Sequence, residues 1–319
     1  MSQNTESACL EKDLRCLACG SGRFEAWARA WDAEYHTTDE RFTLYRCLDC
    51  RVLFIDPVPQ DRLEEIYPPN YYSFVIPKGS LVNILKRWLD GRLFGGVLKD
   101  VPGQRLSVLD VGGGAGWHLN AVKRIDPRVG LTQVVDLDLA AAVIAEKNGH
   151  HFFEGRIQDF RSDICFDFVL LLNLIEHVEN PCEVLIKIRT MLSPKGVVLV
   201  KTPNYDSLDA RLFRHTNWGG YHCPRHWVLF ERGGFTEMAA RAGLQVETFH
   251  YTQGAPFWAT SVLFWLAERG AVSITRERPA VYHPLFPLLN AIFAAFDFLR
   301  GFLGAKTSQM FFVLRGVHP

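Results

Sequence analysis

Val108-Leu-Asp-Val-Gly-Gly-Gly-Ala-Gly116 is the most informative stretch of the sequence. Its first four residues belong to the predicted strand Ser107–Val111, and a helix is expected from about Trp117. A chain that turns tightly beneath a ligand needs residues without a Cβ atom, and the following helix offers free backbone N–H groups. A dinucleotide-binding loop needs the spacing G-x-G-x-x-G, which fits from neither Gly112 nor Gly113. The loop therefore indicates a nucleotide-type ligand other than a dinucleotide, and a plain strand–helix turn is the alternative.

Apolar runs on either side of this loop alternate with helical stretches, which is typical of a parallel α/β sheet. Asp136 ends the run after the loop, at a position where a carboxylate can accept hydrogen bonds from both hydroxyls of a ribose. Asp138 is the nearby competitor for this role, and a solvated acid at a strand end is the alternative. The predicted strands are Ser107–Val111, Gln133–Asp136, Phe166–Leu172, Val197–Lys201, Gln245–Phe249 and Gln309–Leu314.

Taken in order and spacing, these segments resemble the class I S-adenosylmethionine-dependent methyltransferases. The resemblance covers roughly residues 105–249 and the final strand. It rests on Val108–Gly116 as the first motif, Phe166–Val178 with its Glu176-His177 pair as the fourth-strand motif, Leu192–Gly196 as the turn before the fifth strand, Thr202-Pro-Asn204 as its exit loop, and Trp218–His226 as a segment found in a subgroup that acts on metabolites and sugars.

This resemblance implies a Rossmann-like α/β fold with a seven-stranded, mostly parallel sheet, an antiparallel last strand, and S-adenosylmethionine as the methyl donor. His177 is expected to pack under the donor. The chain departs from the family at Val134 and Lys195, where glycine is frequent, and Glu154–Asp159 matches loosely, which puts the adenine contacts in question. The donor-binding residues implied are Asp110, Gly112, Gly114 and Gly116 at the methionine end, Asp136 at the ribose, Arg156 and Ile157 by the adenine, and Asn173 in the fourth-strand motif.

Two C-x2-C pairs, Cys16 with Cys19 and Cys47 with Cys50, predict a zinc site. Four thiolates can close a tetrahedral structural site, and Gly20 suits the tight turn after the first pair. Chance pairing or two redox dithiols is the alternative. Similar zinc ribbons precede the methyltransferase domain in some sugar-modifying C-methyltransferases, and the linker tyrosines Tyr67, Tyr71 and Tyr72 fit that resemblance. The isolated thiols are Cys9, Cys165, Cys182 and Cys223.

The chain has 319 residues, of which 48% are apolar, and its formal net charge is zero. The length allows one large and one small domain, and the charge balance disfavours nucleic acid as a partner. We predict a zinc-ribbon module at 1–56, a linker with leading helices at 57–104 and a methyltransferase domain at 105–319, in which 250–308 form a helical cap insertion. The helical spacing in the linker is carried by Leu81, Ile84, Leu85, Trp88 and Leu89.

Met1–Asp13 lacks the apolar core of a signal peptide, and no stretch reaches the roughly 20 apolar residues of a spanning helix. We therefore expect a cytoplasmic location, where paired cysteines indicate metal. Two apolar runs, Pro256–Ala267 and Pro284–Phe296, favour a cap over the acceptor pocket. The alternative is a cap that also rests on the membrane surface, which would suit a lipid-linked saccharide. Lys and Arg are sparse around the second run, which would weaken attraction to anionic lipid.

His222 and His226 are the predicted catalytic bases, because they follow the fifth strand near the sheet edge where ligands bind and an alcohol must lose its proton. Arg225 between them is expected to hold an acidic or phosphorylated acceptor. The alternatives are that these residues structure a loop, or that His222, Cys223 and His226 bind a second metal ion.

We predict a methyltransferase for a small-molecule, sugar or glycan-type acceptor, with O-methylation slightly favoured over C- or N-methylation. One alternative is an RNA methyltransferase that grips RNA with the zinc ribbon, which the zero net charge disfavours. Another is a non-catalytic zinc-ribbon interaction protein, which the intact glycine loop and Asp136 disfavour.

Overall fold

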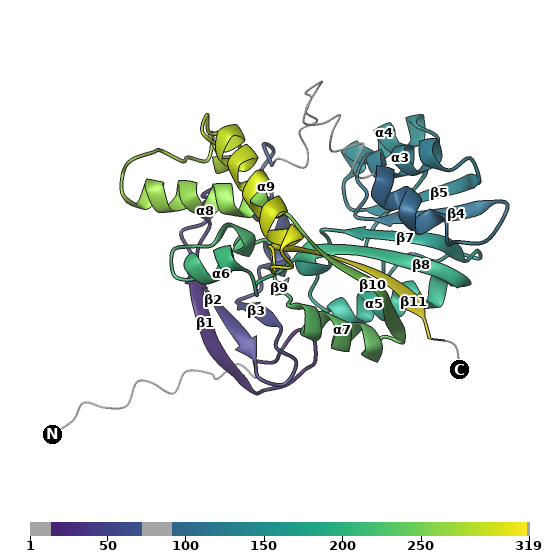
Figure 1. Cartoon of the computed structure of the whole chain (residues 1–319), viewed down its shortest axis with the longest axis horizontal. Coiled ribbons are helices and arrows are strands. Elements are labelled where there is room, and N and C mark those ends of the chain that lie inside the picture. The colour runs from purple at the N-terminus through teal and green to yellow at the C-terminus, as the bar shows by residue number, and fades with distance from the viewer. Residues whose placement is uncertain (1–13, 72–90, 318–319) are drawn as a thin grey trace.

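The computed structural model describes residues 14–71 and 91–317, which build two β-sheets and their covering helices (Figure 1). The larger sheet has the strand order β10-β11-β8-β7-β4-β5-β6. Its strands are β4 (Leu106–Val111), β5 (Val129–Asp136), β6 (His151–Glu154), β7 (Phe166–Leu172), β8 (Leu192–Pro203), β10 (Leu244–Thr252) and β11 (Gln309–Gly316). The first five run parallel, whereas β11 is antiparallel to both β8 and β10. The predicted seven-stranded, mostly parallel sheet with an antiparallel last strand is confirmed.

The predicted turn at Leu192–Gly196 is wrong, because this segment is already part of β8. Leu192 pairs with Phe166 across a register shift, so the strand begins before its apolar run. Gly196 is needed there: a Cβ atom on it would lie 2.8 Å from the Phe166 carbonyl oxygen. The short strand β6 was not foreseen. The helical spacing from Leu81 to Leu89, together with Cys9 and Tyr72, lies outside the described residues.

Helices cover both faces of the larger sheet (Figure 1). One face carries α3 (Trp117–Ile125) and α4 (Leu139–Lys147), and the other carries α5 (Pro181–Met191) and α7 (Arg232–Arg241). Side chains alternate along each strand: Val108 and Phe168 belong to the core on the α3 side, while Leu109 and Val169 belong to the core on the α5 side. The sequence runs that read as continuously apolar are thus buried from both sides.

A smaller antiparallel sheet, whose first two strands connect the first cysteine pair to the second, has the order β1-β2-β3-β9. Its strands are β1 (Phe24–Ala30), β2 (Phe42–Cys47), β3 (Leu53–Asp56) and β9 (Val228–Leu229). The last of these comes from the middle of the methyltransferase region, and Phe42 and Phe54 share one hydrophobic core with Phe235 of α7. The amino-terminal module, residues 14–56, is therefore packed continuously against the larger sheet.

The insertion between β10 and β11 is helical. It contains α8 (Ala255–Glu268) and α9 (Phe286–Phe302), which lie against each other as the Trp258 ring stacks on Phe293 at 4.9 Å. The Gly219 N–H donates a hydrogen bond of 2.8 Å to Ser261 Oγ, so α8 packs on the Trp218–His226 loop. Within 14–71 and 91–317, none of the helices combines the length and apolar character that crossing a bilayer requires.

Candidate active site

The glycine loop leaves the carboxyl end of β4 with Gly112, Gly114 and Gly116 at φ values of 72°, 50° and 76°. A Cβ atom on Gly113 would lie 2.5 Å from Asp110 Cγ, so the protein packs closely against one side of the loop. A Cβ atom on Gly114 would meet no described atom within 4 Å. Among the loop glycines, Gly114 therefore leaves room for a ligand to approach the backbone.

Asp136 is tied directly to this loop. The Gly114 N–H donates to Asp136 Oδ2 at 2.7 Å, and the Asp138 N–H donates to Oδ1 at 3.0 Å. Burial raises the pKa of Asp136, although these backbone donors oppose the shift. The Asp138 side chain instead caps α4 by accepting from the N–H groups of Ala140 and Ala141. The structure thus separates the two acids: Asp136 stands at the loop and Asp138 starts a helix.

Asp110 is buried at the end of β4 and offers an unsatisfied acceptor. Its side-chain Oδ2 has no hydrogen-bond partner among the described residues, although His118 Nδ1 is 3.5 Å away. A buried carboxylate oxygen without a partner is costly, so this position suits a bound group that carries an N–H or ammonium donor. The open Gly114, the Asp136 carboxylate and this acceptor together fit S-adenosylmethionine.

The remaining predicted donor-binding residues lie at the same sheet edge. The Gly155 N–H donates to the Asp136 carbonyl oxygen at 3.0 Å, which brings Arg156 and the buried Ile157 beside the end of β5. Asn173 follows β7 with φ at 53°, and its N–H donates to the Lys201 carbonyl oxygen at 2.8 Å. Arg156 and Asn173 both have exposed side chains.

The four predicted zinc ligands come together in the amino-terminal module. Cys16 Sγ lies 3.6 Å from Cys50 Sγ, and Cys19 Sγ lies 3.6 Å from Cys47 Sγ. Thiolates at about 2.3 Å from a tetrahedral zinc ion would be about 3.8 Å apart, so the spacing fits zinc. Gly20 has φ at 73° and donates its N–H to the Cys16 carbonyl oxygen, as the tight turn requires. The donor set and its geometry suit a closed structural site.

Both ring nitrogens of His222 make hydrogen bonds to other side chains. Its Nδ1 is 2.7 Å from Glu34 Oε2, and its Nε2 is 3.0 Å from the Tyr71 hydroxyl. Because a carboxylate only accepts, Nδ1–H donates to Glu34, which leaves Nε2 to accept from Tyr71 in the neutral ring. Sequence reasoning missed Glu34, which is separated from His222 by 188 positions and follows β1 in the amino-terminal module.

The prediction that Arg225 holds an acidic acceptor is wrong. Arg225 is fully buried, and its two terminal nitrogens donate to the Asp32 carboxylate oxygens at 3.1 and 2.9 Å. Burial alone would raise the pKa of Asp32, but the Arg225 guanidinium lowers it to about 2. The cation is therefore already neutralised inside the protein, and it joins the loop before β9 to the amino-terminal module.

The buried Glu176 and His226 and the half-buried His177 form a polar cluster beside His222. The rings of His177 and His226 have centroids 4.7 Å apart. Burial raises the pKa of Glu176 to about 8 and lowers the pKa of His177 to about 3. Two groups among the described residues could each hold a metal ion: this set and the four cysteines. The alternative set of His222, Cys223 and His226 does not come together.

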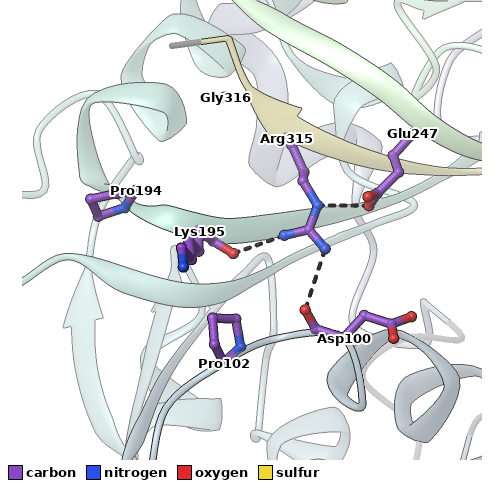
Figure 2. A pocket seen from close by; sticks show the side chains of 7 residues that line it. All are labelled: Asp100, Pro102, Pro194, Lys195, Glu247, Arg315 and Gly316. Carbon is purple, nitrogen blue, oxygen red and sulfur yellow. Dashed lines mark hydrogen bonds and ion pairs between the residues drawn. The ribbon is translucent and has the colours of Figure 1, made fainter.

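A hollow of about 420 Å³ lies at the opposite edge of the larger sheet, where β8 begins and β11 ends. Figure 2 shows the side chains that line it. The Arg315 side chain spans it by donating to Glu247 Oε2 and to the Lys195 carbonyl oxygen, both at 2.8 Å. The glycine loop lies at the carboxyl ends of the parallel strands, so this hollow is not part of the donor site. Its lining is Asp100, Pro102, Pro194, Lys195, Glu247, Arg315 and Gly316.

The comparisons with known proteins agree with this geometry. A family model described as a methyltransferase domain matches residues 85–248, which is just over half of the chain. The chain therefore belongs to the methyltransferase-domain family, among the class I S-adenosylmethionine-dependent methyltransferases.

Curated relatives match a smaller part. A ubiquinone biosynthesis O-methyltransferase of Rickettsia bellii is 31% identical over 102 residues, which are 31% of this chain and 42% of the relative. The chain thus spans about two fifths of the length of that protein. A coclaurine N-methyltransferase bound to N-methylheliamine and SAH is similar in structure, with 14% identity, a TM-score of 0.48 and 81% of each chain covered. A plantazolicin methyltransferase in complex with SAH has 15% identity and a TM-score of 0.47, over 82% of this chain and 91% of that one.

Proposed function

We propose that this chain transfers a methyl group from S-adenosylmethionine to an oxygen atom of a small-molecule or saccharide acceptor. The observation that carries this proposal is the Glu34–His222–Tyr71 chain of hydrogen bonds, which gives the site a group able to take a proton from a hydroxyl. The O-methyltransferase name of the Rickettsia relative also favours oxygen.

The donor supplies a sulfonium methyl group, and the residues of the chain hold the donor and remove the acceptor proton. With the donor bound, Asp136 would accept from the ribose hydroxyls, and Asp110 would accept from the methionine amino group. The backbone at Gly114 lets the donor approach closely, and loop residues near Arg156 and Ile157 border the adenine. Since displacement at a methyl group depends strongly on alignment, a rigid glycine loop contributes by positioning.

His222 is the proposed general base. As the acceptor oxygen bonds to the methyl carbon and the sulfur–methyl bond breaks, the acceptor proton passes to the Tyr71 oxygen and the Tyr71 proton passes to His222 Nε2. Glu34 stabilises the imidazolium that results, because its carboxylate already accepts from Nδ1–H. His226 is the weaker candidate, since its Nδ1–H donates to the Gly220 carbonyl oxygen at 2.8 Å and no carboxylate is hydrogen-bonded to it among the described contacts.

We further propose a cytoplasmic protein whose cap rests on the membrane surface, with a lipid-linked acceptor. Exposed apolar side chains recur every three or four positions along the outer face of α9, which is the pattern of an interfacial helix. The only charged residues of this helix, Asp297 and Arg300, bond to each other at 2.8 Å, with Asp297 buried. The exposed stripe is Leu285, Leu288, Ile292, Phe296, Leu299 and Leu303.

Donor carrying a deuterated methyl group tests the proposed function. Purified protein is incubated with this donor and with separate metabolite, glycan, lipid and RNA extracts, and the products are analysed by mass spectrometry. The proposal expects label on oxygen in a metabolite, glycan or lipid-linked saccharide, and less label with Asp136→Ala when the donor is not saturating. Label confined to RNA would instead support an RNA methyltransferase, and label on nitrogen or carbon would contradict the role of the base.

A further inference from the structure

Three side chains with metal-binding atoms, two of them buried and one half-buried, meet where the larger sheet faces the amino-terminal module. Glu176 and His177 lie in η3 (Ile175–His177), just after β7, and His226 lies just before β9. One potential ligand atom from each lies within 4.8 Å of the other two. Glu176 is completely buried and His226 is 5% exposed, so bulk water does not separate them.

The two imidazoles are held in the way that metal-binding histidines usually are. The Nδ1–H of His226 donates to the Gly220 carbonyl oxygen at 2.8 Å. His177 Nδ1 lies 3.0 Å from both the Arg225 carbonyl oxygen and the Tyr67 hydroxyl. Because a carbonyl oxygen only accepts, Nδ1 carries a proton and donates. Each neutral ring therefore keeps its lone pair on Nε2. Hydrogen bonds from the other ring nitrogen to backbone carbonyls fix both tautomer and ring orientation, as in known metal sites.

Glu176 has one side-chain oxygen that lacks a hydrogen-bond partner among the described residues. Its Oε2 accepts from the Thr202 hydroxyl at 3.0 Å, whereas Oε1 is buried and has no hydrogen-bond partner among the described residues. Such an atom calls for an explanation, because buried polar atoms are nearly always paired. A cation bound between Oε1 and the two imidazoles would supply the missing partner.

We infer that Glu176, His177 and His226 bind a divalent transition-metal ion, in addition to the ion expected at the four cysteines. Two imidazoles and one carboxylate are a donor set that suits Zn²⁺, Mn²⁺, Fe²⁺ or Co²⁺. The two sites differ in kind. Four thiolates close a structural site, whereas three protein ligands leave at least one coordination position open. The His222 ring lies next to that of His226, with centroids 5.0 Å apart, so an oxygen-bearing acceptor held near His222 could become a further ligand.

Cobalt titration of the full chain tests this inference without donor or acceptor, so its outcome is independent of the proposed function. Metal-free protein is titrated with Co²⁺, and bound metal is counted by elemental analysis. Wild-type protein should bind about two equivalents. One should give the intense near-ultraviolet absorption of cobalt thiolate, and the other only weak visible bands. Glu176→Gln and His226→Ala should weaken the second ion at least about 100-fold and leave the thiolate absorption unchanged.

His222→Ala is the matched control, because this neighbouring histidine uses both ring nitrogens on Glu34 and Tyr71. It should retain two equivalents. Saturation of the wild type at one equivalent would overturn the inference, as would two equivalents in folded Glu176→Gln and His226→Ala. If either variant does not fold, ¹⁵N resonances of His177 and His226 in the wild type decide. Zn²⁺ beyond the first equivalent should shift their Nε2 signals, and unshifted signals would contradict the site.

Discussion

The guanidinium of Arg225 and the carboxylate of Asp32 form a fully buried, bidentate ion pair, with N–O distances of 3.1 and 2.9 Å. Asp32 follows β1 in the amino-terminal module, and Arg225 lies in the loop between β8 and β9. The Arg225 guanidinium also lies 4.6 Å above the Tyr35 ring. The loop that carries His222 and His226 is thus fixed to the amino-terminal module as well as to the larger sheet.

Asp32→Ala should destabilise the fold by about 3–5 kcal/mol, because it leaves a buried guanidinium without its partner. Urea unfolding measures this loss. Glu237→Ala is the control, since its exposed pair with Arg241 should contribute no more than about 0.5 kcal/mol. The pKa of Asp32 is lowered to about 2, so its contribution is present above an unfolded pKa of about 3.9 and is lost as the pH falls towards 2. Equal losses of unfolding free energy in the Asp32→Ala and Glu237→Ala variants would contradict this prediction.

Zinc at the four cysteines should be necessary for the amino-terminal module to fold. Cys16→Ser removes one thiolate of the closed site and should lower the melting temperature, because metal binding is linked to folding. Differential scanning calorimetry with and without chelator measures the effect. Cys165→Ser, an exposed thiol outside the cluster, is the control and should behave as the wild type. Protein prepared without chelator or acid that lacks metal at the thiolates would rule out the zinc assignment.

Asp136→Ala should weaken S-adenosylmethionine binding by about 1–3 kcal/mol, the cost of losing charged hydrogen bonds to a diol. Gly114→Val should weaken it at least as much, because its side chain would enter the open space that the ligand needs and its φ of 50° disfavours a β-branched residue. Calorimetry measures both affinities, with Asp167→Asn as a control on β7. Unchanged affinity in the first two variants would place the donor elsewhere.

Replacing the proposed base should reduce turnover and spare donor binding. His222→Ala is expected to lower kcat by about 10²–10⁴. Tyr71→Phe and Glu34→Gln should also lower kcat, with little change in KM for the donor, because Tyr71 relays the acceptor proton to His222 and Glu34 stabilises the imidazolium that forms. The labelled acceptor found in the extract experiment provides the assay. Full activity of His222→Ala together with a large loss in His226→Ala would assign the base to His226, and full activity of both would exclude the pair.

The α9 stripe should bind vesicles weakly. Leu299 and Leu303 are 63% and 81% exposed, so Leu299→Glu with Leu303→Glu should abolish flotation of the protein with vesicles. Val143→Glu changes an equally exposed residue on α4 and should have no effect. Vesicles with and without anionic lipid should differ little, since few basic residues flank the stripe. A wild type that stays entirely with the soluble fraction would leave α9 as part of a cap alone.

The sheet was predictable because its strands carry local signals: they are apolar runs of strand length, and the first two end just before Gly112 and at Asp136 on the ligand edge. The four cysteines were predictable for a similar reason, because each pair has the C-x2-C spacing of metal-binding cysteines. Strand β6 was not predicted, because His151–Glu154 is too short and too polar to show a recognisable strand pattern. The turn at Leu192–Gly196 was misread, because proline and glycine near a strand can also mark an irregular pairing.

The surroundings of the histidines could not be predicted from local pattern. Glu34 and Asp32 are remote in sequence from His222 and Arg225, and only the packing of the amino-terminal module brings them together. Charge alone suggested that Arg225 faces an acceptor, whereas burial selects for an internal counterion. The signal that could have helped is Trp31-Asp-Ala-Glu-Tyr35, where two acids lie among aromatic residues directly after an apolar strand.

The pairing of β3 with β9 has a consequence for biosynthesis. During translation the first three strands of the amino-terminal module emerge long before Val228 and Leu229, so the outer edge of β3 stays unpaired until most of the chain has been made. An apolar edge strand in that state is a template for association with other chains. A release of the nascent chain before β9 would therefore yield a fragment prone to aggregate, and co-expression of a downstream fragment carrying β9 should restore its solubility.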